Sequence, residues 1–260
     1  MKVVGFVGPK HSGKDTCALI AKKQKRLKTS VSFALPLKRI CSEVFQISMN
    51  YFTDQDLKEK PFKEPVKVTV KHLRAIKEAM TEYVDPAGEG TYYNPNKATS
   101  KLVGTLFKTP RQILQVIGTE FIRDEIHEDW HCMAAFSEKN LKIVLGKSYN
   151  VVVAVTDCRF ANEFNFLSRK FGEDLKFFYV ERPSAEEVLA EATHRSETGV
   201  LEVKELLLAN GGEVIDNSGS LQDLEDTVKG LNLPKKATGK AAKEGKPEPG
   251  SRFRWGLRGA

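Results

Sequence analysis

The sequence predicts an α/β fold of three layers, in which helices cover both faces of a central parallel sheet of five strands. Short apolar runs alternate with segments of helical periodicity along most of the chain, as in parallel sheets joined by crossover helices. The first apolar run leads into a glycine-bounded loop and then a helix, a unit that binds phosphate. With 260 residues, 40% of them hydrophobic, the chain can build one domain with a sizeable core.

Five strands and six helices are expected to form this core. The strands cover Lys2–Val7, Ser30–Phe33, Asn150–Val155, Lys176–Val180 and Glu213–Ile215. The helices cover Lys14–Lys28, Leu37–Phe45, Pro110–Glu125, Glu128–Asn140, Asn162–Phe171 and Leu221–Gly230. Ligands of parallel sheets bind at the carboxyl ends of the strands, so functional side chains are expected there.

Two segments depart from the alternation. Residues 47–108 contain a polar helical pattern over Val68–Tyr83 between turns rich in Pro, Lys and Glu. We interpret them as an inserted, mobile segment on the acceptor side of the site, with an ordinary surface insertion as the alternative. Residues 234–260 have few large apolar side chains and are expected to form a flexible tail. The folded domain is therefore predicted to span residues 1–233.

The charge of the chain is concentrated in this tail. Of the formal net charge of +7, the tail carries +6, so residues 1–233 are nearly neutral. Nucleic acid is therefore not expected as a partner of the folded domain. The four cysteines have no metal-binding spacing, and neither a signal segment nor a long apolar run is present. These features predict a cytoplasmic protein with reduced thiols and no membrane partner.

The glycine-bounded loop follows the first strand. Gly8 and Gly13 bracket four residues, among them Ser12, and Lys14 begins the helix. Backbone N–H groups of such a loop point at phosphates, and its lysine reaches the β- and γ-phosphates of a nucleoside triphosphate. A glycine-rich turn without a ligand is the alternative.

The residue after the lysine departs from the usual pattern. Ser or Thr normally stands there and its hydroxyl holds Mg²⁺. This chain has Asp15 at that place and Thr16 next, and either can hold the metal. Alternatively, Asp15 simply stabilises the N-terminus of the helix as an anion.

Two further strand ends carry charged residues. Lys38 lies in the first turn of the second helix, where a lysine opposes the helix dipole and can serve an anionic ligand. Asp157 follows an apolar strand and can orient Mg²⁺ or the acceptor. Arg159 can bind a phosphate bidentately, and Glu163 can pair with Arg159 or receive an acceptor hydroxyl. The alternatives are a solvated lysine and an aspartate helix cap beside a local Arg–Glu pair.

The helix that begins at Pro110 has one apolar and one polar stripe. Arg111, Gln115 and Thr119 recur every four residues and can face one small molecule. Gly118 predicts a close backbone approach by another element or by a ligand, and Trp130 can stack on a base. An amphipathic helix with a packing glycine is the alternative.

The carboxyl-terminal part supplies candidates for phosphoryl transfer. Arg182 and Arg195 can close over the transferring group if residues 182–197 form a lid. The last strand ends next to Asn217, in a loop expected beside the phosphate loop and able to hold the adenine.

Taken in order, these motifs resemble those of the phage-type deoxynucleoside monophosphate kinases over about residues 3–230. The resemblance is carried by Ser12-Gly13-Lys14-Asp15-Thr16, Pro36-Leu37-Lys38, Leu114-Gln115 with Gly118-Thr119-Glu120, Asp157-x-Arg159 with Glu163, Arg182-Pro183, His194-x-Ser196-Glu197 and Asn217-Ser218-Gly219-Ser220. It implies a P-loop kinase fold with an inserted acceptor-binding region and a lid.

The resemblance also implies transfer of the ATP γ-phosphate to a deoxynucleoside monophosphate, in host cytoplasm if a phage encodes the chain. ATP and Mg²⁺ would bind at residues 13–16. The acceptor would be surrounded by Lys38, Arg111, Gly118, Thr119, Trp130, Asp157, Arg159 and Glu163. A homodimer stays open. The alternatives are a kinase for another small acceptor, such as dephospho-coenzyme A or phosphomevalonate, and a nucleotide-gated nucleic-acid-binding protein.

Overall fold

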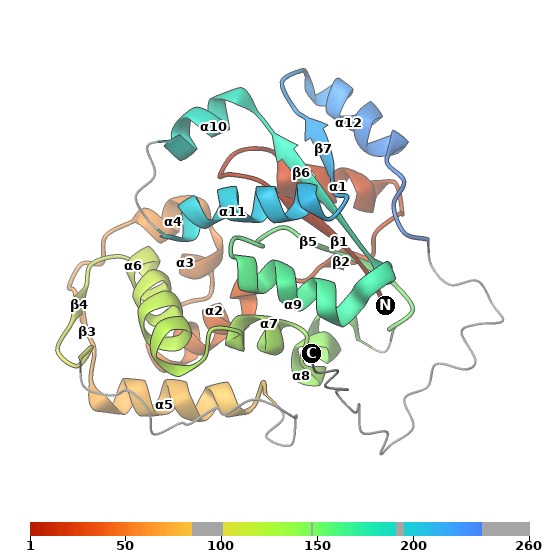
Figure 1. Ribbon diagram of the computed structural model, residues 1–260. Helices are drawn as coiled ribbons and strands as arrows, with labels where there is room; N and C mark the ends of the chain where they lie inside the picture. Colours follow the sequence, from red (N-terminus) through yellow and green to blue (C-terminus); the bar gives the residue numbers. More distant parts are fainter. Residues whose placement is uncertain (85–100, 147, 191–194, 236–260) are drawn as a thin grey trace, which may run out of the picture.

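The computed structural model describes residues 1–84, 101–146, 148–190 and 195–235. Its main sheet has the strand order β2-β5-β1-β6-β7, and every neighbouring pair is parallel. The strands are β1 (Lys2–Val7), β2 (Thr29–Ser30), β5 (Val152–Val155), β6 (Leu175–Glu181) and β7 (Glu213–Asp216). Figure 1 shows β1 in the middle of the sheet. The predicted five-stranded parallel sheet is confirmed.

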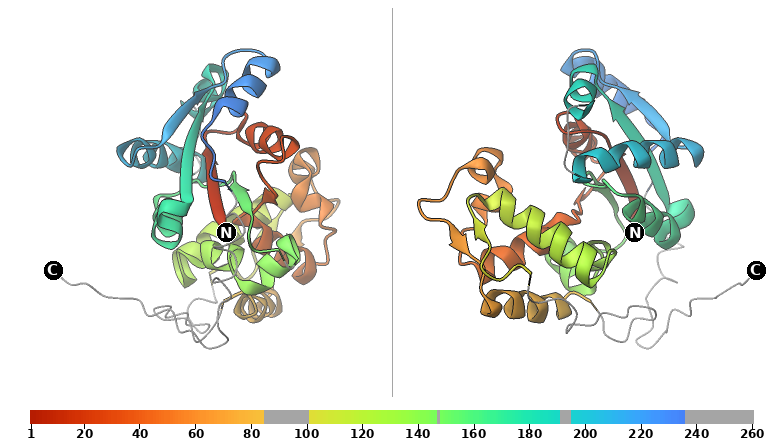
Figure 2. Two further views of the ribbon diagram at one scale, coloured as in Figure 1. Left: turned by 90° about the vertical axis from the view of Figure 1, so that its right-hand side faces the viewer. Right: turned by 60° about the vertical axis from the view of Figure 1, so that its left-hand side comes forward.

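Helices cover both faces of the sheet, as Figure 2 shows from two directions. Successive side chains of a strand point to opposite faces, and β1 is buried on both. Its residues Val4 and Phe6 pack with helices α1 (Lys14–Lys23) and α12 (Leu221–Gly230). On the other face, Val3 and Val7 pack with α9 (Ala161–Phe171) and α11 (Arg195–Ala209). The structure therefore has the three layers expected from the sequence.

A second apolar core includes side chains from the described part of segment 47–108. Figure 1 shows the helices that form it beside the sheet. Its largest contributors are α2 (Ala34–Val44), α5 (Val70–Thr81), α6 (Pro110–Gln115), η1 (Val116–Ile126) and α7 (Trp130–Ala135). The short helices α3 (Asn50–Thr53) and α4 (Gln55–Glu59) pack against α6. Strands β3 (Val66–Lys67) and β4 (Leu106–Phe107) form an antiparallel pair that the sequence did not predict.

The first predicted helix ends at Lys23 instead of Lys28, and two further helices differ in kind or number. The helix expected over Pro110–Glu125 becomes a π-helix, η1, after Gln115. Gly118 lies in η1, where an added Cβ would come within 2.7 Å of Leu37 Cδ2, so the close approach it predicted is made by α2. The helix expected over Glu128–Asn140 is divided into α7 and α8 (Glu138–Leu145).

The remaining elements complete the layers. They are the 3₁₀ turn η2 (Gly172–Asp174) and helix α10 (Pro183–Ala190). No helix in the described part of the chain combines the length and apolar character needed to cross a bilayer. Most of the predicted tail, residues 236–260, lies outside the described residues, as do residues 85–100 of segment 47–108 and residues 191–194 of the predicted lid.

Candidate active site

The loop between β1 and α1 has a backbone shape that only glycine fits at two positions. A Cβ at Gly8 would lie 2.5 Å from Ser12 Oγ and 2.6 Å from the Val180 carbonyl oxygen. Gly13 has a φ of 100°, and a Cβ there would lie 2.3 Å from Asn217 Nδ2. The loop is therefore a closely fitted turn of the kind that presents backbone N–H groups to an anion.

Lys14 and Ser12 place polar atoms inside this loop. The Lys14 ammonium is buried and donates a hydrogen bond of 2.9 Å to the Pro9 carbonyl oxygen. The Ser12 hydroxyl is fully buried and has no hydrogen-bond partner among the described residues. Such buried polar atoms normally have partners, so the loop is suited to a polar ligand. Asn217, at the end of β7, donates a hydrogen bond of 2.7 Å to the Ser12 carbonyl oxygen, so the loop after β7 lies beside the phosphate loop. The amide supports the loop, a role that the sequence did not predict, and a contact of this residue with adenine stays a prediction.

Asp15 and Thr16 follow in the first turn of α1. Asp15 is exposed and its carboxylate accepts a hydrogen bond of 2.7 Å from the Thr156 hydroxyl at the end of β5, while Thr16 is half-buried. A carboxylate and a hydroxyl suit Mg²⁺, which is usually held by one or two protein groups together with phosphates. The described residues contain no group of three His, Cys, Asp or Glu that could hold a metal.

Asp157 caps a helix that begins far away in the sequence. Its carboxylate accepts hydrogen bonds from the Ser32 hydroxyl (2.6 Å) and from the N–H groups of Phe33 (3.1 Å) and Ala34 (3.0 Å), at the start of α2. These N–H groups have no partner within the helix, and a negative charge is stabilised beside them. Asp157 therefore fixes α2, and Lys38 on it, to the end of β5.

Four cations from different elements lie within electrostatic reach of one another. Burial lowers the pKa of Lys38, and the carboxylate of Asp157 partly offsets this decrease. The charge of Arg159 lowers the same pKa further, while Asp15 of the phosphate loop raises it. Burial also lowers the pKa of Lys58, on α4, to about 8, with further decreases from Lys38, Arg111 and Arg159. We call Lys38, Lys58, Arg111 and Arg159 the cation cluster. The cluster lies beside the phosphate loop, because the Thr156 hydroxyl, next to Asp157, donates to Asp15 and Asp15 acts on Lys38.

Lys58 is the functional candidate that the sequence did not reveal. It stands in the mixed run Lys58-Glu59-Lys60, which is typical of a solvated helix face. The neighbouring Glu59 forms an ion pair with Arg111 across to α6, and this contact joins α4 to the predicted polar stripe. The only sequence signal is the placement of this run inside segment 47–108.

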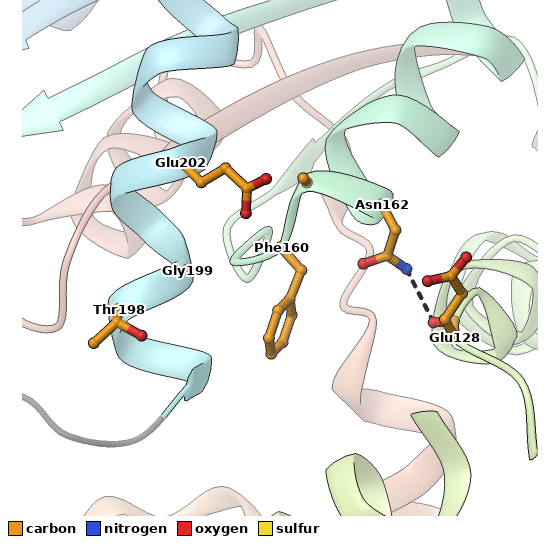
Figure 3. Close-up of a pocket in the computed structure, with 7 residues that line it drawn as sticks. Glu128, Phe160, Asn162, Thr198, Gly199 and Glu202 are labelled. Carbon is orange, nitrogen blue, oxygen red and sulfur yellow. Dashed lines mark hydrogen bonds between the residues drawn. The ribbon is translucent and has the colours of Figure 1, made fainter. Parts of the chain in front are cut away.

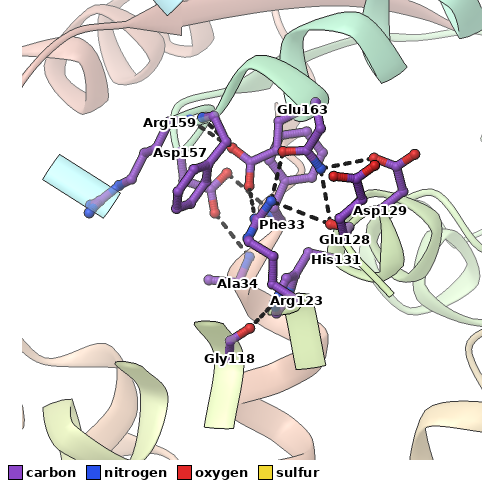
Figure 4. Close-up of polar contacts among 12 residues, drawn as sticks. Phe33, Ala34, Gly118, Arg123, Glu128, Asp129, His131, Asp157, Arg159 and Glu163 are labelled. Carbon is purple, nitrogen blue, oxygen red and sulfur yellow. Dashed lines mark hydrogen bonds and ion pairs between the residues drawn. The ribbon is translucent and has the colours of Figure 1, made fainter. Parts of the chain in front are cut away.

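Glu163 holds the loop that carries Arg159. Its carboxylate accepts hydrogen bonds from the backbone N–H groups of Arg159 (2.7 Å) and Phe160 (3.2 Å). It also forms a buried ion pair of 2.6 Å with Arg123, which is shown in Figure 4. Burial raises the pKa of Glu163, and Arg123 opposes this increase. The expected pairing of Glu163 with the Arg159 side chain is replaced by contacts with the Arg159 backbone and with Arg123.

Trp130 is placed differently from the prediction. It is fully buried in the second core, where its ring makes edge contacts with Tyr83 and His131. It therefore has no surface on which a base can stack. The first turn of α7 faces the second core, and the local sequence pattern does not predict which way this turn faces. Thr119 is half-buried, and the Gly118 carbonyl accepts a hydrogen bond of 2.9 Å from His131 Nε2.

In the part of the chain that the structure describes, the two predicted lid arginines do not belong to the cation cluster. Arg182 is exposed, and its carbonyl oxygen accepts hydrogen bonds from the first N–H groups of α10. Arg195 begins α11, but its side chain lies outside the described part of the chain. Closure of Arg182 and Arg195 over the transferring group therefore stays a prediction from the sequence.

Comparison with known proteins gives two relatives in sequence. The chain is 26% identical over 220 residues to the deoxynucleoside-5'-monophosphate kinase of Escherichia phage T5, covering 76% of this chain and 84% of the relative. It is 23% identical over 244 residues to a protein of Acanthamoeba polyphaga mimivirus called "Putative deoxynucleotide monophosphate kinase", covering 89% of this chain and all of the relative. The chain is an ATP-dependent phosphotransferase. The likenesses support a nucleotide kinase.

Two other comparisons add little to this. No protein-family model matches the chain. Among solved structures, the dephospho-CoA kinase of Campylobacter jejuni is 16% identical and has a TM-score of 0.37, with 88% of this chain and 94% of that chain covered.

Proposed function

We propose that the protein is a deoxynucleoside monophosphate kinase, which transfers the γ-phosphoryl group of ATP to a deoxynucleoside monophosphate. The observation that carries the proposal is the position of the cation cluster beside the phosphate loop. Asp157 accepts hydrogen bonds from the first N–H groups of α2, which bears Lys38, and the hydroxyl of the neighbouring Thr156 donates to Asp15 of the loop. Two phosphate-binding sites side by side are what phosphoryl transfer between two nucleotides requires. The names of the two relatives agree with this acceptor.

In this proposal the loop binds ATP. Backbone N–H groups between Gly8 and Lys14 and the Ser12 hydroxyl bind the phosphates. Lys14 exchanges the Pro9 carbonyl for the β- and γ-phosphates. Asp15 and Thr16 would hold Mg²⁺, which neutralises charge on the phosphates when it is bound. Asn217 keeps the loop in shape through Ser12.

The cation cluster binds the acceptor. Arg159 can grip its phosphate bidentately, with Lys38, Lys58 and Arg111 around it. Positioning and charge stabilisation then carry the reaction, without a strong base. Arg182 and Arg195 are proposed to join the site from the lid, and Asp157 to orient Lys38 through α2.

A panel of acceptors tests the proposed function. With ATP and Mg²⁺, ADP release is expected with dAMP, dCMP, dGMP or dTMP, and weaker release with the ribonucleotides. Dephospho-coenzyme A and phosphomevalonate are included in the same assay. Turnover of either of these compounds alone, or salt-sensitive DNA binding without any turnover, would contradict the proposal.

Replacing Lys58 with methionine is expected to raise the KM for the deoxynucleoside monophosphate about 10- to 100-fold, the effect of losing one charged contact to phosphate. The KM for ATP should stay within a factor of two. In wild type the acceptor KM should increase above about pH 8, because Lys58 loses its proton there in the free protein. Steady-state kinetics over a pH series measure both effects.

The matched control is Lys60→Met, since Lys60 is exposed at the end of the same helix. It should change neither KM. If Lys58→Met leaves the acceptor KM and its pH dependence as in wild type, Lys58 has no part in the acceptor site.

A further inference from the structure

One edge of the main sheet lies at β7, which pairs with β6 alone among the described strands. The N–H of Asn217, directly after β7, donates a hydrogen bond of 2.8 Å to the Glu181 carbonyl oxygen of β6. Successive residues of a strand direct their backbone groups alternately to its two sides, so the N–H and C=O groups of Val214 and Asp216 point to the free edge. Such an edge is a template for a further strand.

Val214 also leaves an apolar surface uncovered beside this edge. The next residue, Ile215, packs with α1 and α12 in the core on one face of the sheet. The Val214 side chain therefore points to the opposite face, on which α11 lies. Val214 is nevertheless 46% exposed, because α11 packs mainly on β6 and β1.

Helix α11 adds to this surface on its side toward β7. Glu202 lines a cavity of about 390 Å³ between α11 and α9 (Figure 3). Lys204 stands about 200° further round the helix and points away from α9, and its ammonium donates a hydrogen bond of 2.7 Å to the Glu181 carboxylate on β6. Leu201 and Leu208 lie on the Lys204 side of the helix and are 47% and 45% exposed. We call the three exposed side chains on this surface the apolar strip: Leu201, Leu208 and Val214.

The elements around β7 are strongly acidic. Residues 198–233 carry seven carboxylates and two lysines, a formal charge of −5, whereas residues 1–197 carry +6. Four of the carboxylates are exposed on β7 and α12: Glu213, Asp216, Asp223 and Asp226. A second copy of the chain would bring like charges together at this edge, which disfavours a pair of joined β7 strands. The edge therefore fits a partner that is basic and partly apolar.

The carboxyl-terminal tail of the chain has this chemistry. Residues 234–260 carry a formal charge of +6. Near the end of the tail, apolar and basic side chains alternate over Arg252-Phe253-Arg254-Trp255-Gly256-Leu257-Arg258. An alternation of period two is typical of a strand with one apolar and one charged face.

The tail is also long enough to bring this segment to β7. Leu233, two residues before the last described residue, packs in the same core as Ile215 of β7. Sixteen residues separate Lys235 from Arg252. At about 3.3 Å per extended residue they can span roughly 50 Å, about the width of the whole domain.

We propose that residues 252–258 bind the free edge of β7 in the same chain as an added strand. Backbone hydrogen bonds to Val214 and Asp216 supply the affinity, and the two faces of the segment supply the specificity. Its aromatic and leucine side chains cover the apolar strip. Its arginines point to the other face of the sheet, where Glu213 and the carboxylates of α12 lie. The folded domain is thus the partner of its own basic tail.

The test uses Trp255 in the full chain as the probe. Trp130, the other tryptophan, is fully buried, so the difference in fluorescence between wild type and Trp255→Phe reports on Trp255. In wild type, Trp255 should have blue-shifted emission and be protected from quenching by acrylamide. Val214→Lys should abolish both effects, because it replaces the centre of the apolar strip with a charge that repels the arginines. Salt at about 1 M, where the Debye length is about 3 Å, should weaken the protection in wild type.

Amide exchange of β7 gives a second measurement that does not depend on the fold of Val214→Lys. The amides of Val214 and Asp216 should exchange at least about tenfold faster in the double variant Phe253→Ser with Trp255→Ser than in wild type, as expected if the edge is occupied for about nine-tenths of the time or more. The control is Ile143→Lys, since Ile143 is an exposed apolar residue on α8, 54% exposed and remote from β7 in the sequence. It should leave the protection of Trp255 and of both amides as in wild type.

Three results would overturn the proposal. The first is quenching of Trp255 that is the same in wild type and Val214→Lys, together with β7 amides that the tail variant does not change. The second is a wild-type mass of two chains that falls to one in Val214→Lys, which would assign the edge to a second copy. The third is a Trp255 that is protected only after DNA is added, which would assign the tail to nucleic acid.

Discussion

Replacing Lys14 with methionine is expected to lower kcat about 10³-fold or more while the protein stays folded. The Lys14 ammonium is the buried cation of the phosphate loop and is held 2.9 Å from the Pro9 carbonyl oxygen. Negative charge on the transferring group is stabilised by such a fixed donor in a site that excludes water, and loss of one donor of this kind costs about 10²–10³ in rate or more. Methionine keeps the length of the side chain and removes the charge.

The measurement is ADP release at saturating ATP and acceptor, with far-UV circular dichroism and a urea midpoint to show that the fold is kept. Lys22→Met is the control, because Lys22 is exposed in the last turn of the same helix. It should have wild-type kcat. A folded Lys14→Met protein that turns over within a few-fold of wild type would remove Lys14 from the mechanism and with it the assignment of the loop.

The second large effect is expected for stability. Arg123→Met should lower the free energy of unfolding by about 3–5 kcal/mol, since it leaves the buried Glu163 carboxylate without its counter-charge. The guanidinium also donates a hydrogen bond of 2.7 Å to Asn162 Oδ1, and this hydrogen bond is lost as well. Urea denaturation of wild type and variant measures the difference.

The pH dependence distinguishes this cause from lost packing. Burial already raises the pKa of Glu163, and without Arg123 the increase is larger. A carboxyl whose pKa is higher in the folded state than in the unfolded state binds more protons when folded, so stability increases as the pH falls toward the unfolded pKa. The deficit of Arg123→Met should therefore be largest near neutral pH and shrink as the pH falls toward 5. A deficit that is constant with pH would contradict an electrostatic origin.

An exposed ion pair supplies the control for this experiment. Glu138 and Lys142 are paired at 2.6 Å on the surface of α8, with 76% and 64% of their side chains exposed. Glu138→Gln should change stability by no more than about 0.5 kcal/mol.

Local sequence signals predicted the sheet because its strands are apolar runs that need no partner to be recognised. The same holds for the loop, where Gly8 and Gly13 stand at positions that admit no Cβ. Features that depend on distant contacts were not predicted. The π-helix η1 places the Gly118 carbonyl against His131, and its hydrogen-bond period is not visible in a 3.6-residue pattern.

In the site, too, features set by local sequence were predicted and features set by distant contacts were not. Asp157 was recognised as a functional candidate or a cap, but the sequence does not show that the helix it caps begins 123–125 residues earlier. Lys58 is not evident from the sequence, because a lysine among charged residues resembles a solvated one and only the fold brings Lys38, Arg111 and Arg159 near it. Trp130 has the same helical spacing whether it faces the core or a ligand, and the structure places it in the core.

The centre of the molecule is synthesised first, but the segments that complete it are synthesised much later. Strand β1 is synthesised first, yet its neighbours in the sheet are β5 and β6. The glycine loop that follows β1 is held by Asn217, which is 205 residues further along. At a translation rate of about 5–20 residues per second, roughly 10 to 40 seconds separate the synthesis of the loop from that of its support. Until then the nascent chain has the residues of a nucleotide site without the contacts that give the site its shape.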